Sequence, residues 1–132
     1  MAGTFKFELV SPERILLSVD ADDVVVPGIE GDFTVYAGHA PVISTLKPGF
    51  LEVTTGGSKR RIFLKSGFAE VNAESVTVLA ETAYDQSEMD AKRIADELAT
   101  AESELAAAKD DEGRMMAEAA VSKLRAMSSK GA

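Results

Sequence analysis

One stretch decides the fold class of this chain: FLEVTTGGSKRRIFL, at residues 50–64. Two strand-like runs, at 50–54 and 61–65, lie on either side of Gly56 and Gly57. Paired glycines suit the tight turn of a β hairpin, because both central positions of that turn need a positive φ. The stretch therefore predicts two antiparallel strands joined by a short turn.

Short strand-like segments lie on both sides of this β hairpin. Residues 4–10 alternate, with Phe5, Phe7 and Leu9 on one face, which is the pattern of a half-buried strand. Turn-forming residues recur at intervals of about 8–12 residues, as in β sandwiches and barrels. The acidic residues 20–23 are expected to form a loop. The remaining strands are predicted at 14–19, 24–26, 31–36, 42–46, 68–71 and 76–79.

The composition changes abruptly near residue 85. All six Phe and both Tyr lie before it, which argues against one evenly packed globule. We predict a β domain at 1–84 and a helical hairpin at 85–132, with Ser87 capping the first helix and Gly113 in a left-handed turn between the helices. The apolar stripes of the two helices are Ile94, Leu98, Ala101, Leu105 and Ala108, then Met116, Ala120, Leu124 and Met127.

The helical hairpin is predicted to be weakly held. Its stripes are mostly alanine, and each alanine buries little apolar area, so the helical hairpin should lean on the β domain or on a partner. Residues 85–113 carry ten acids and three bases, whereas residues 114–132 carry four bases and one acid. The second helix can therefore attract the first, or it can leave and bind an acidic partner surface.

Composition also excludes several classes of function. A net charge of −8 disfavours nucleic acid as a partner, because an acidic surface repels phosphate. One His and no Cys leave no constellation for nucleophilic catalysis and no thiolate metal site. No apolar run approaches the roughly 20 residues of a membrane span. We expect a protein that is not an enzyme, requires no cofactor or metal and does not insert directly into a membrane.

The most specific part of the sequence is PGIEGDFTVYAGHAP at 27–41, continued by LKPG at 46–49. Together with VSPE at 10–13, KSGFAEV at 65–71 and VTVLAE at 76–81, it resembles the epsilon subunit of bacterial F-type ATP synthases, which is homologous to the mitochondrial delta subunit. The resemblance covers the whole β domain, and the helical hairpin follows where the family has one. It implies a ten-stranded β sandwich followed by an antiparallel two-helix hairpin.

The resemblance also implies a function. The family's β domain binds the gamma subunit and the c-ring, and so passes proton-driven rotation to the catalytic head. Its helical hairpin can fold down on the sandwich, or extend to the alpha/beta head and block ATP hydrolysis. The chain is then a non-catalytic rotor subunit at the cytoplasmic face of the bacterial inner membrane, held there through the ATP synthase complex.

Two loops of the β domain match family contact sites. The resemblance places Glu30 and Asp32 at the end that meets the c-ring, although both could be simple turn acids. It places His39, Pro41 and Val42 near the gamma interface, although His39 could be an ordinary loop residue.

The start of the first helix resembles an ATP-binding motif. Some bacterial epsilon subunits carry Ile/Leu-Asp-x-x-Arg-Ala, and this chain keeps Asp90 and Arg93 but has Met89 and Ile94 at the flanking positions. Arg93 could meet phosphate and Asp90 a sugar hydroxyl, which makes ATP a candidate regulatory ligand. The alternative, which we favour, is a capped helix start with an Asp90/Arg93 pair one turn apart.

The basic second helix suggests where an extended arm would bind. We hypothesise that Arg114, Lys123 and Arg125 contact acidic loops of the catalytic head. A function from a different class also remains open, namely a free-standing nucleotide-sensing β-sandwich module that has no rotor partners.

Overall fold

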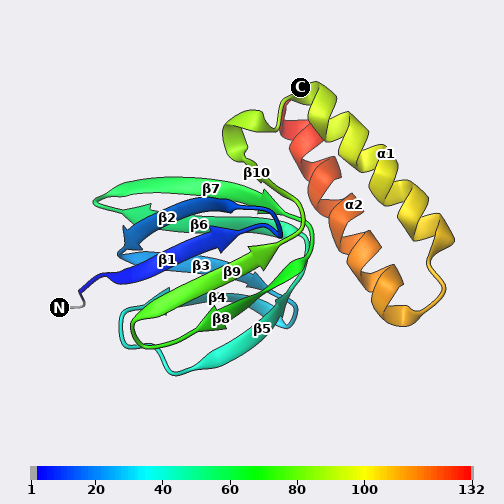
Figure 1. Cartoon of the computed structure of the whole chain (residues 1–132). Coiled ribbons are helices and arrows are strands. Elements are labelled where there is room, and N and C mark those ends of the chain that lie inside the picture. Colours follow the sequence, from blue (N-terminus) through cyan, green and yellow to red (C-terminus); the bar gives the residue numbers. More distant parts are fainter. Residues whose placement is uncertain (1–2, 132) are drawn as a thin grey trace.

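The computed structural model describes residues 3–131 as a β sandwich followed by two helices (Figure 1). The strands are β1 (Phe5–Val10), β2 (Ile15–Ala21), β3 (Asp23–Gly28), β4 (Gly31–Tyr36), β5 (Val42–Leu46), β6 (Gly49–Thr55), β7 (Ser58–Leu64), β8 (Gly67–Val71), β9 (Ser75–Ala80) and β10 (Ala83–Asp85). The 3-10 helix η1 (Gln86–Glu88), α1 (Ala91–Ala107) and α2 (Asp111–Gly131) follow them.

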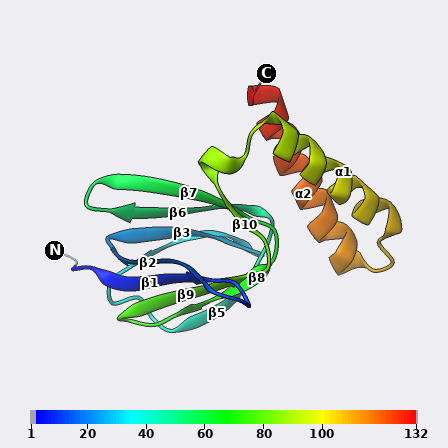
Figure 2. The same cartoon turned by 45° about the horizontal axis from the view of Figure 1, so that its top comes forward.

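The ten strands form one sheet that folds over into two layers. The strand order is β10-β7-β6-β3-β5-β8-β9-β1-β2, with β4 paired to β3. A single pair, Gly28 with Leu46, joins β3 to β5, so the sheet bends there into a β4-β3-β6-β7-β10 layer and a β5-β8-β9-β1-β2 layer. Figure 2 shows β7, β6 and β3 lying over β1, β9 and β5. The predicted ten-stranded sandwich is therefore confirmed.

The main core fills the space between the two layers. The alternation predicted for the first strand is confirmed, since Phe5, Phe7 and Leu9 are all buried and face inward. Facing inner surfaces interdigitate in this way in β sandwiches. The core residues are Phe5, Phe7, Leu9, Ala21, Val24, Val26, Val35, Leu46, Leu51, Val53, Ile62, Leu64, Ala69, Val71, Val76, Val78 and Ala80.

The β hairpin at 50–64 has the predicted turn. Gly56 and Gly57 have φ values of +56° and +86°, and Thr55 pairs with Ser58 across them. The prediction of an acidic loop at residues 20–23 is wrong. β2 runs to Ala21 and β3 starts at Asp23, because Ala21 is buried opposite Phe5 and only Asp22 makes the bend.

The linker and the helix ends differ from the sequence prediction. Strand β10 was not predicted, since three residues carry too little periodicity, and it adds to the sheet by pairing with β7. Ser87 does not cap α1; Asp90 does. Gly113 lies inside the first turn of α2, where its N–H donates to the Asp110 carboxylate at 2.7 Å. The break between the helices falls at residues 108–110 instead.

Candidate functional site

An aromatic row crosses the outer face of the β10-β7-β6 end of the sandwich. Tyr84, Phe63 and Phe50 are aligned in register on three neighbouring strands, and we call them the covered row. The Phe50 and Phe63 rings meet edge to face with centroids 5.7 Å apart, and the Arg61 guanidinium lies 4.0 Å from the centre of the Phe50 ring. Phe63 is fully buried although it faces away from the main core, so something must cover it.

The helical hairpin covers this row. Ile94 and Ala101 of α1, Ala120, Val121 and Leu124 of α2, and Met89 of the linker form one buried cluster with Phe63. Most of the apolar stripes predicted from the sequence thus form the seam, whereas Ala108 and Met116, near the loop between the helices, lie outside this cluster. The expectation that the helical hairpin leans on the β domain is confirmed.

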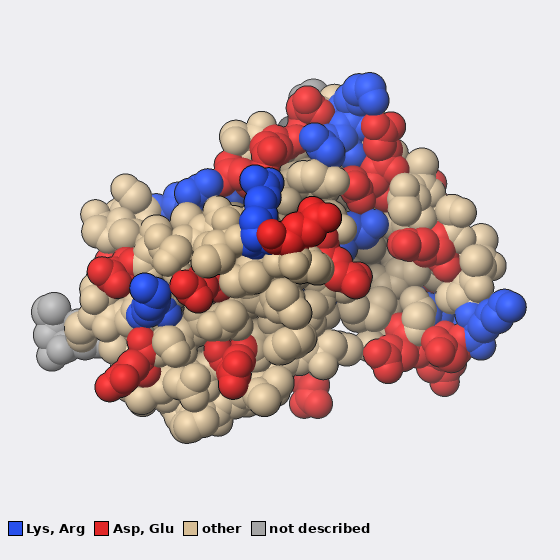
Figure 3. Space-filling model, in the orientation of Figure 1, with Lys and Arg blue, Asp and Glu red and all other residues tan. Residues whose placement is uncertain are grey.

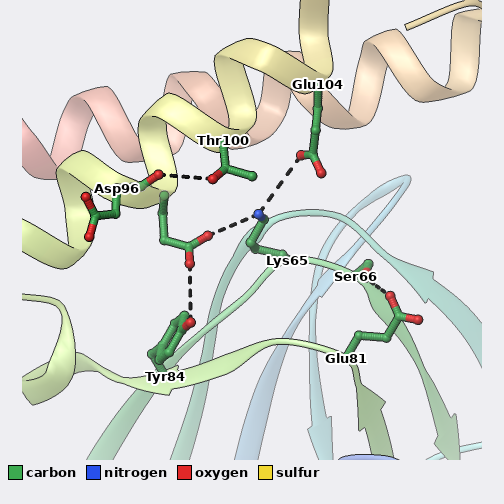
Figure 4. A network of polar contacts seen from close by, with 8 residues as sticks. Lys65, Ser66, Glu81, Tyr84, Asp96, Thr100 and Glu104 are labelled. Carbon is green, nitrogen blue, oxygen red and sulfur yellow. Dashed lines mark hydrogen bonds and ion pairs between the residues drawn. The ribbon is translucent and has the colours of Figure 1, made fainter. Parts of the chain in front are cut away.

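A largely buried ion pair joins the sandwich to α1 beside the covered row. Lys65 Nζ lies 3.0 Å from Glu97 Oε1, and the Tyr84 hydroxyl donates to the other oxygen of Glu97 at 3.2 Å (Figure 4). The two charged side chains are only 16% and 17% exposed. Glu104, two helical turns farther along α1, lies 4.0 Å from the same ammonium group but is 59% exposed. One lysine therefore holds the only largely buried ion pair of the described residues.

Asp90 and Arg93, the two residues of the ATP-like motif, are engaged separately. The Asp90 carboxylate caps α1 by accepting from the backbone N–H of Arg93 at 2.8 Å. The Arg93 guanidinium lies 4.3 Å from the centre of the Tyr84 ring, in a cation–π contact. The structure shows the capped helix start of our preferred interpretation, but the expected Asp90/Arg93 side-chain pair is wrong, because the Arg93 guanidinium lies on Tyr84 instead.

Two cavities flank the seam between the helical hairpin and the sandwich. Each has a volume of about 330 Å³. Phe50, Arg61, Met89 and Lys123 help to line the first, and Lys65 and Glu104 help to line the second. Both open to solvent, so the seam is bordered by water on two sides.

The three predicted head-contact residues differ in their surroundings. Arg125 pairs with Glu102 of α1 at 2.9 Å, and Arg114 lies 3.5 Å from Asp111 in its own helix turn. Lys123 is exposed at the mouth of the first cavity. The predicted attraction between the acidic and basic helices is confirmed by the Arg125–Glu102 pair. Figure 3 shows charged residues crowding over the helices, with broad uncharged areas over the strands.

A second apolar row crosses the outer face of the opposite layer, and sequence reasoning missed it. Ile15, Val10, Leu79 and Phe68 are aligned in register across β2, β1, β9 and β8, and we call them the open row. Phe68 is 42% exposed. Each residue occupies an outward position of its strand, where a solvated sheet face would carry polar groups. Apolar residues at outward positions break the alternation of apolar and polar residues along these strands. That break is the sequence signal that could have revealed the row.

The open row continues toward the loop that precedes β5. Ile43 is 71% exposed and lies diagonally across from Phe68, because Thr45 is the direct partner of Phe68. Val42, the predicted contact residue, lies on the same face of β5 as the buried Leu46, which is the inner face. It is exposed because it is the first residue of the strand, at the edge of the sandwich. Ile43 is therefore the residue of this pair that the outer face presents.

The loop with His39 and Pro41 is held to the sandwich. The His39 ring donates from Nδ1 to the Ala40 carbonyl at 2.7 Å, and its centroid lies 6.4 Å from that of Phe33. Gly38 N–H donates to the Ala73 carbonyl at 2.8 Å. These contacts give the loop a defined shape and leave Pro41 exposed.

Glu30 and Asp32 lie at the other end of β4, in and beside the β3–β4 turn. Both are exposed, and Lys47 Nζ lies 3.7 Å from the Asp32 carboxylate. The turn is fixed because Ile29 N–H donates to the Thr45 carbonyl at 2.9 Å. The structure thus separates the predicted c-ring residues from the predicted gamma residues by the length of a strand.

Asp85 anchors the linker between the sandwich and α1. Hydrogen bonds from Ser87, and the Arg60 guanidinium at 2.9 Å, lower the pKa of its carboxyl group. The same carboxylate caps η1, and Glu88 closes the capping box on the Asp85 N–H at 2.9 Å. The linker therefore leaves β10 in a fixed direction.

Two kinds of site do not occur within residues 3–131. No three His, Asp or Glu side chains of this part gather where they could hold a metal ion. No helix of this part is long and apolar enough to cross a membrane.

Comparison with known proteins identifies close relatives of the chain. The family model for the β-sandwich domain of the ATP synthase delta/epsilon chain matches residues 4–86. An ATP synthase epsilon chain from Parvibaculum lavamentivorans is 49% identical over 118 residues, 89% of each chain, and one from Maricaulis maris is 46% identical over 127 residues, 96% of each. A chain in the cryo-EM structure of the Euglena gracilis mitochondrial ATP synthase, determined with OSCP, F1 and c-ring, superposes with a TM-score of 0.74 at 25% identity, over 98% of this chain and 82% of that one.

Proposed function

This chain belongs to the family of ATP synthase delta/epsilon chains, and from that premise we propose that its sandwich couples gamma to the c-ring while its helical hairpin is a detachable brake. As an epsilon chain it is a non-catalytic subunit of the central stalk. Membership in the family removes the alternative of a free-standing sensing module. In this proposal the subunit is peripheral, held at the cytoplasmic face of the bacterial inner membrane by its partners.

The open row is the observation that carries the coupling role. The sandwich has one apolar row on the outer face of each layer, and the chain's own helical hairpin covers only one of them. An uncovered contiguous apolar surface marks an interaction site. We assign it to gamma, together with Ile43 and the adjoining loop of His39, Pro41 and Val42.

The acidic neighbours of the open row refine this assignment. Glu8 and Glu70 lie on the next outward row of the same face, with Thr77 between them. A polar rim around an apolar centre is typical of protein interfaces, and complementary charges favour the correct partner. The matching surface of gamma should therefore be apolar with a basic margin.

The c-ring contact belongs to the β3–β4 turn. Glu30 and Asp32 are exposed on a turn whose backbone is hydrogen-bonded to β5, so the turn can bear load without changing shape. The Ile29–Thr45 hydrogen bond joins this turn to β5, and β5 pairs with β8 of the open-row layer. A connected, fixed path of this kind suits a body that transmits torque.

The helical hairpin has the properties of a brake. In the docked state, two of the three cations that we assign to the alpha/beta head are already paired with acids of the helical hairpin, Arg125 with Glu102 and Arg114 with Asp111. Separation of α1 from α2 would release Arg125 for the head. The docked state thus hides part of the surface that the extended state would use.

A complex assembled with residues 1–85 alone tests both halves of the proposal. The cut keeps β10, which the sheet needs. Assembly and ATP synthesis should persist because every proposed rotor contact lies before the cut, whereas ATP hydrolysis should rise about fivefold or more as the brake is lost. The truncation uncovers Phe63, so circular dichroism first establishes that residues 1–85 are folded. Failure of the folded domain to assemble would refute the assignment of the open row to gamma, and unchanged hydrolysis would refute the brake. Lys92→Gln in the full chain is the matched control, since Lys92 is exposed on α1 and belongs neither to the docked seam nor to the proposed head contacts.

The proposed regulation does not use ATP as a ligand of this chain. Asp90 and Arg93 are already engaged as a helix cap and on Tyr84, and Met89 and Ile94 fill the flanking positions of the motif with buried side chains. Isothermal titration of the chain with ATP should give no binding heat up to about 1 mM, a limit that corresponds to roughly −4 kcal/mol. A saturable heat that Arg93→Ala removes would contradict this prediction.

A further inference from the structure

We propose that the Lys65–Glu97 ion pair is a latch that determines whether the helical hairpin is docked. The inference rests on the proposed brake and names the contact that holds the brake in its off position. The apolar part of the seam is a small cluster separate from the main core: the sandwich contributes only the covered row, and the linker and helices add Met89, Ile94, Ala101, Ala120, Val121 and Leu124. Solvent-open pockets of about 330 Å³ border it on both sides. Largely buried polar contacts beside so small a cluster therefore contribute to how firmly the helical hairpin is held.

The latch differs from the surface ion pairs of the molecule. Lys65 and Glu97 are 16% and 17% exposed, whereas Arg125 and Glu102 are 65% and 46% exposed. Exposed pairs contribute little because water and salt screen them, but a desolvated charge that loses its partner is costly. The same carboxylate accepts from the Tyr84 hydroxyl, so a single residue of α1 is bound by two residues of the sandwich.

The position of the latch makes release a single event. Glu97 lies in the second turn of α1, and Arg93, one turn earlier, rests on the same Tyr84 ring that donates to Glu97. Any movement of α1 away from the sheet separates Lys65 and Tyr84 from Glu97 together. The residues between Asp85 and Asp90, which are η1 and Met89, are the segment about which α1 would turn.

Thiol labelling of the isolated full chain measures this equilibrium directly. The chain has no cysteine, so Val121→Cys, inside the covered seam, introduces a single thiol whose labelling rate reports how often the helical hairpin opens. Glu97→Gln keeps an acceptor for Tyr84 but removes the charge, and it should speed labelling roughly tenfold or more. Lys65→Met should have a similar effect. Glu104→Gln is the matched control and should change the rate by less than about twofold.

The double variant Lys65→Met/Glu97→Gln isolates the pair from its surroundings. With both charges gone, no unpaired charge remains. The fold increase in its labelling rate should therefore be well below the product of the fold increases caused by the two single variants. Three results would overturn the latch. The first is labelling within twofold of the parent rate for both single variants, and the second is an equal increase for Glu104→Gln. The third is a double variant whose increase equals the product of the two single increases. Because labelling needs no partner, this result is independent of whether removal of residues 86–132 changes hydrolysis in the complex.

Discussion

Gly67→Ala should leave the chain largely unfolded at 25 °C. A Cβ at this position would lie 1.9 Å from the Leu79 carbonyl oxygen and 3.0 Å from the Ala80 Cα, and the glycine has a φ of +148°. Gly67 pairs with Leu46 on one side and Ala80 on the other, so neither neighbouring strand can yield without breaking the β5-β8-β9 ladder. We expect a loss of about 4 kcal/mol or more, comparable to the whole stability of a small domain.

Urea unfolding followed by circular dichroism measures this effect, and Gly56→Ala provides the control. Gly56 also has a positive φ, of +56°, but has open space where its Cβ would be. Its substitution should cost only about 1–2 kcal/mol, the price of a left-handed alanine. Equal unfolding midpoints for the two variants would show that the close approach at Gly67 is not what restricts the position.

Phe68→Asp should weaken binding of the chain to gamma by about 30-fold or more. Phe68 is the largest residue of the open row, and a charge there would face the apolar centre of the proposed contact. Truncation of a central interface residue commonly costs 2 kcal/mol or more, and a buried unpaired carboxylate adds to that cost. Phe68 is outside the main core, so the fold should tolerate the change.

Calorimetric titration of purified gamma with the variant chain measures the loss. Ser58→Asp is the matched control, since it places the same charge at an exposed position at the far tip of the β6–β7 turn. It should bind like the parent. Parental affinity for Phe68→Asp, at an unchanged unfolding midpoint, would remove the open row from the gamma interface.

Local patterns predicted most of the fold. Alternation of large apolar residues located β1 and β4, paired glycines located the β6–β7 turn, and the change in composition near residue 85 separated strands from helices. These signals work because each depends on neighbours in the sequence. β10 was not predicted because its three residues form a strand only through pairing with β7, a partner about twenty residues earlier in the chain.

The functional surfaces were less accessible to sequence reasoning. The covered row and the open row each collect side chains from strands far apart in the sequence, so no single segment contains either row. The Lys65–Glu97 pair likewise joins residues whose separation depends on how the helical hairpin docks. Family resemblance supplied Glu30, Asp32 and His39, but it could not show that Ile43, rather than Val42, faces outward.

The parallel pairing of β1 with β9 constrains when the molecule can form during synthesis. Lys6 is aligned with Ser75, so the first strand obtains its second neighbour only after more than half of the chain has left the ribosome. Until then the β1–β2 ribbon has an unpaired edge, which can associate with other chains, and closing so long a loop slows folding. The β1–β2 ribbon is therefore the part of this sheet that waits longest for its second neighbour.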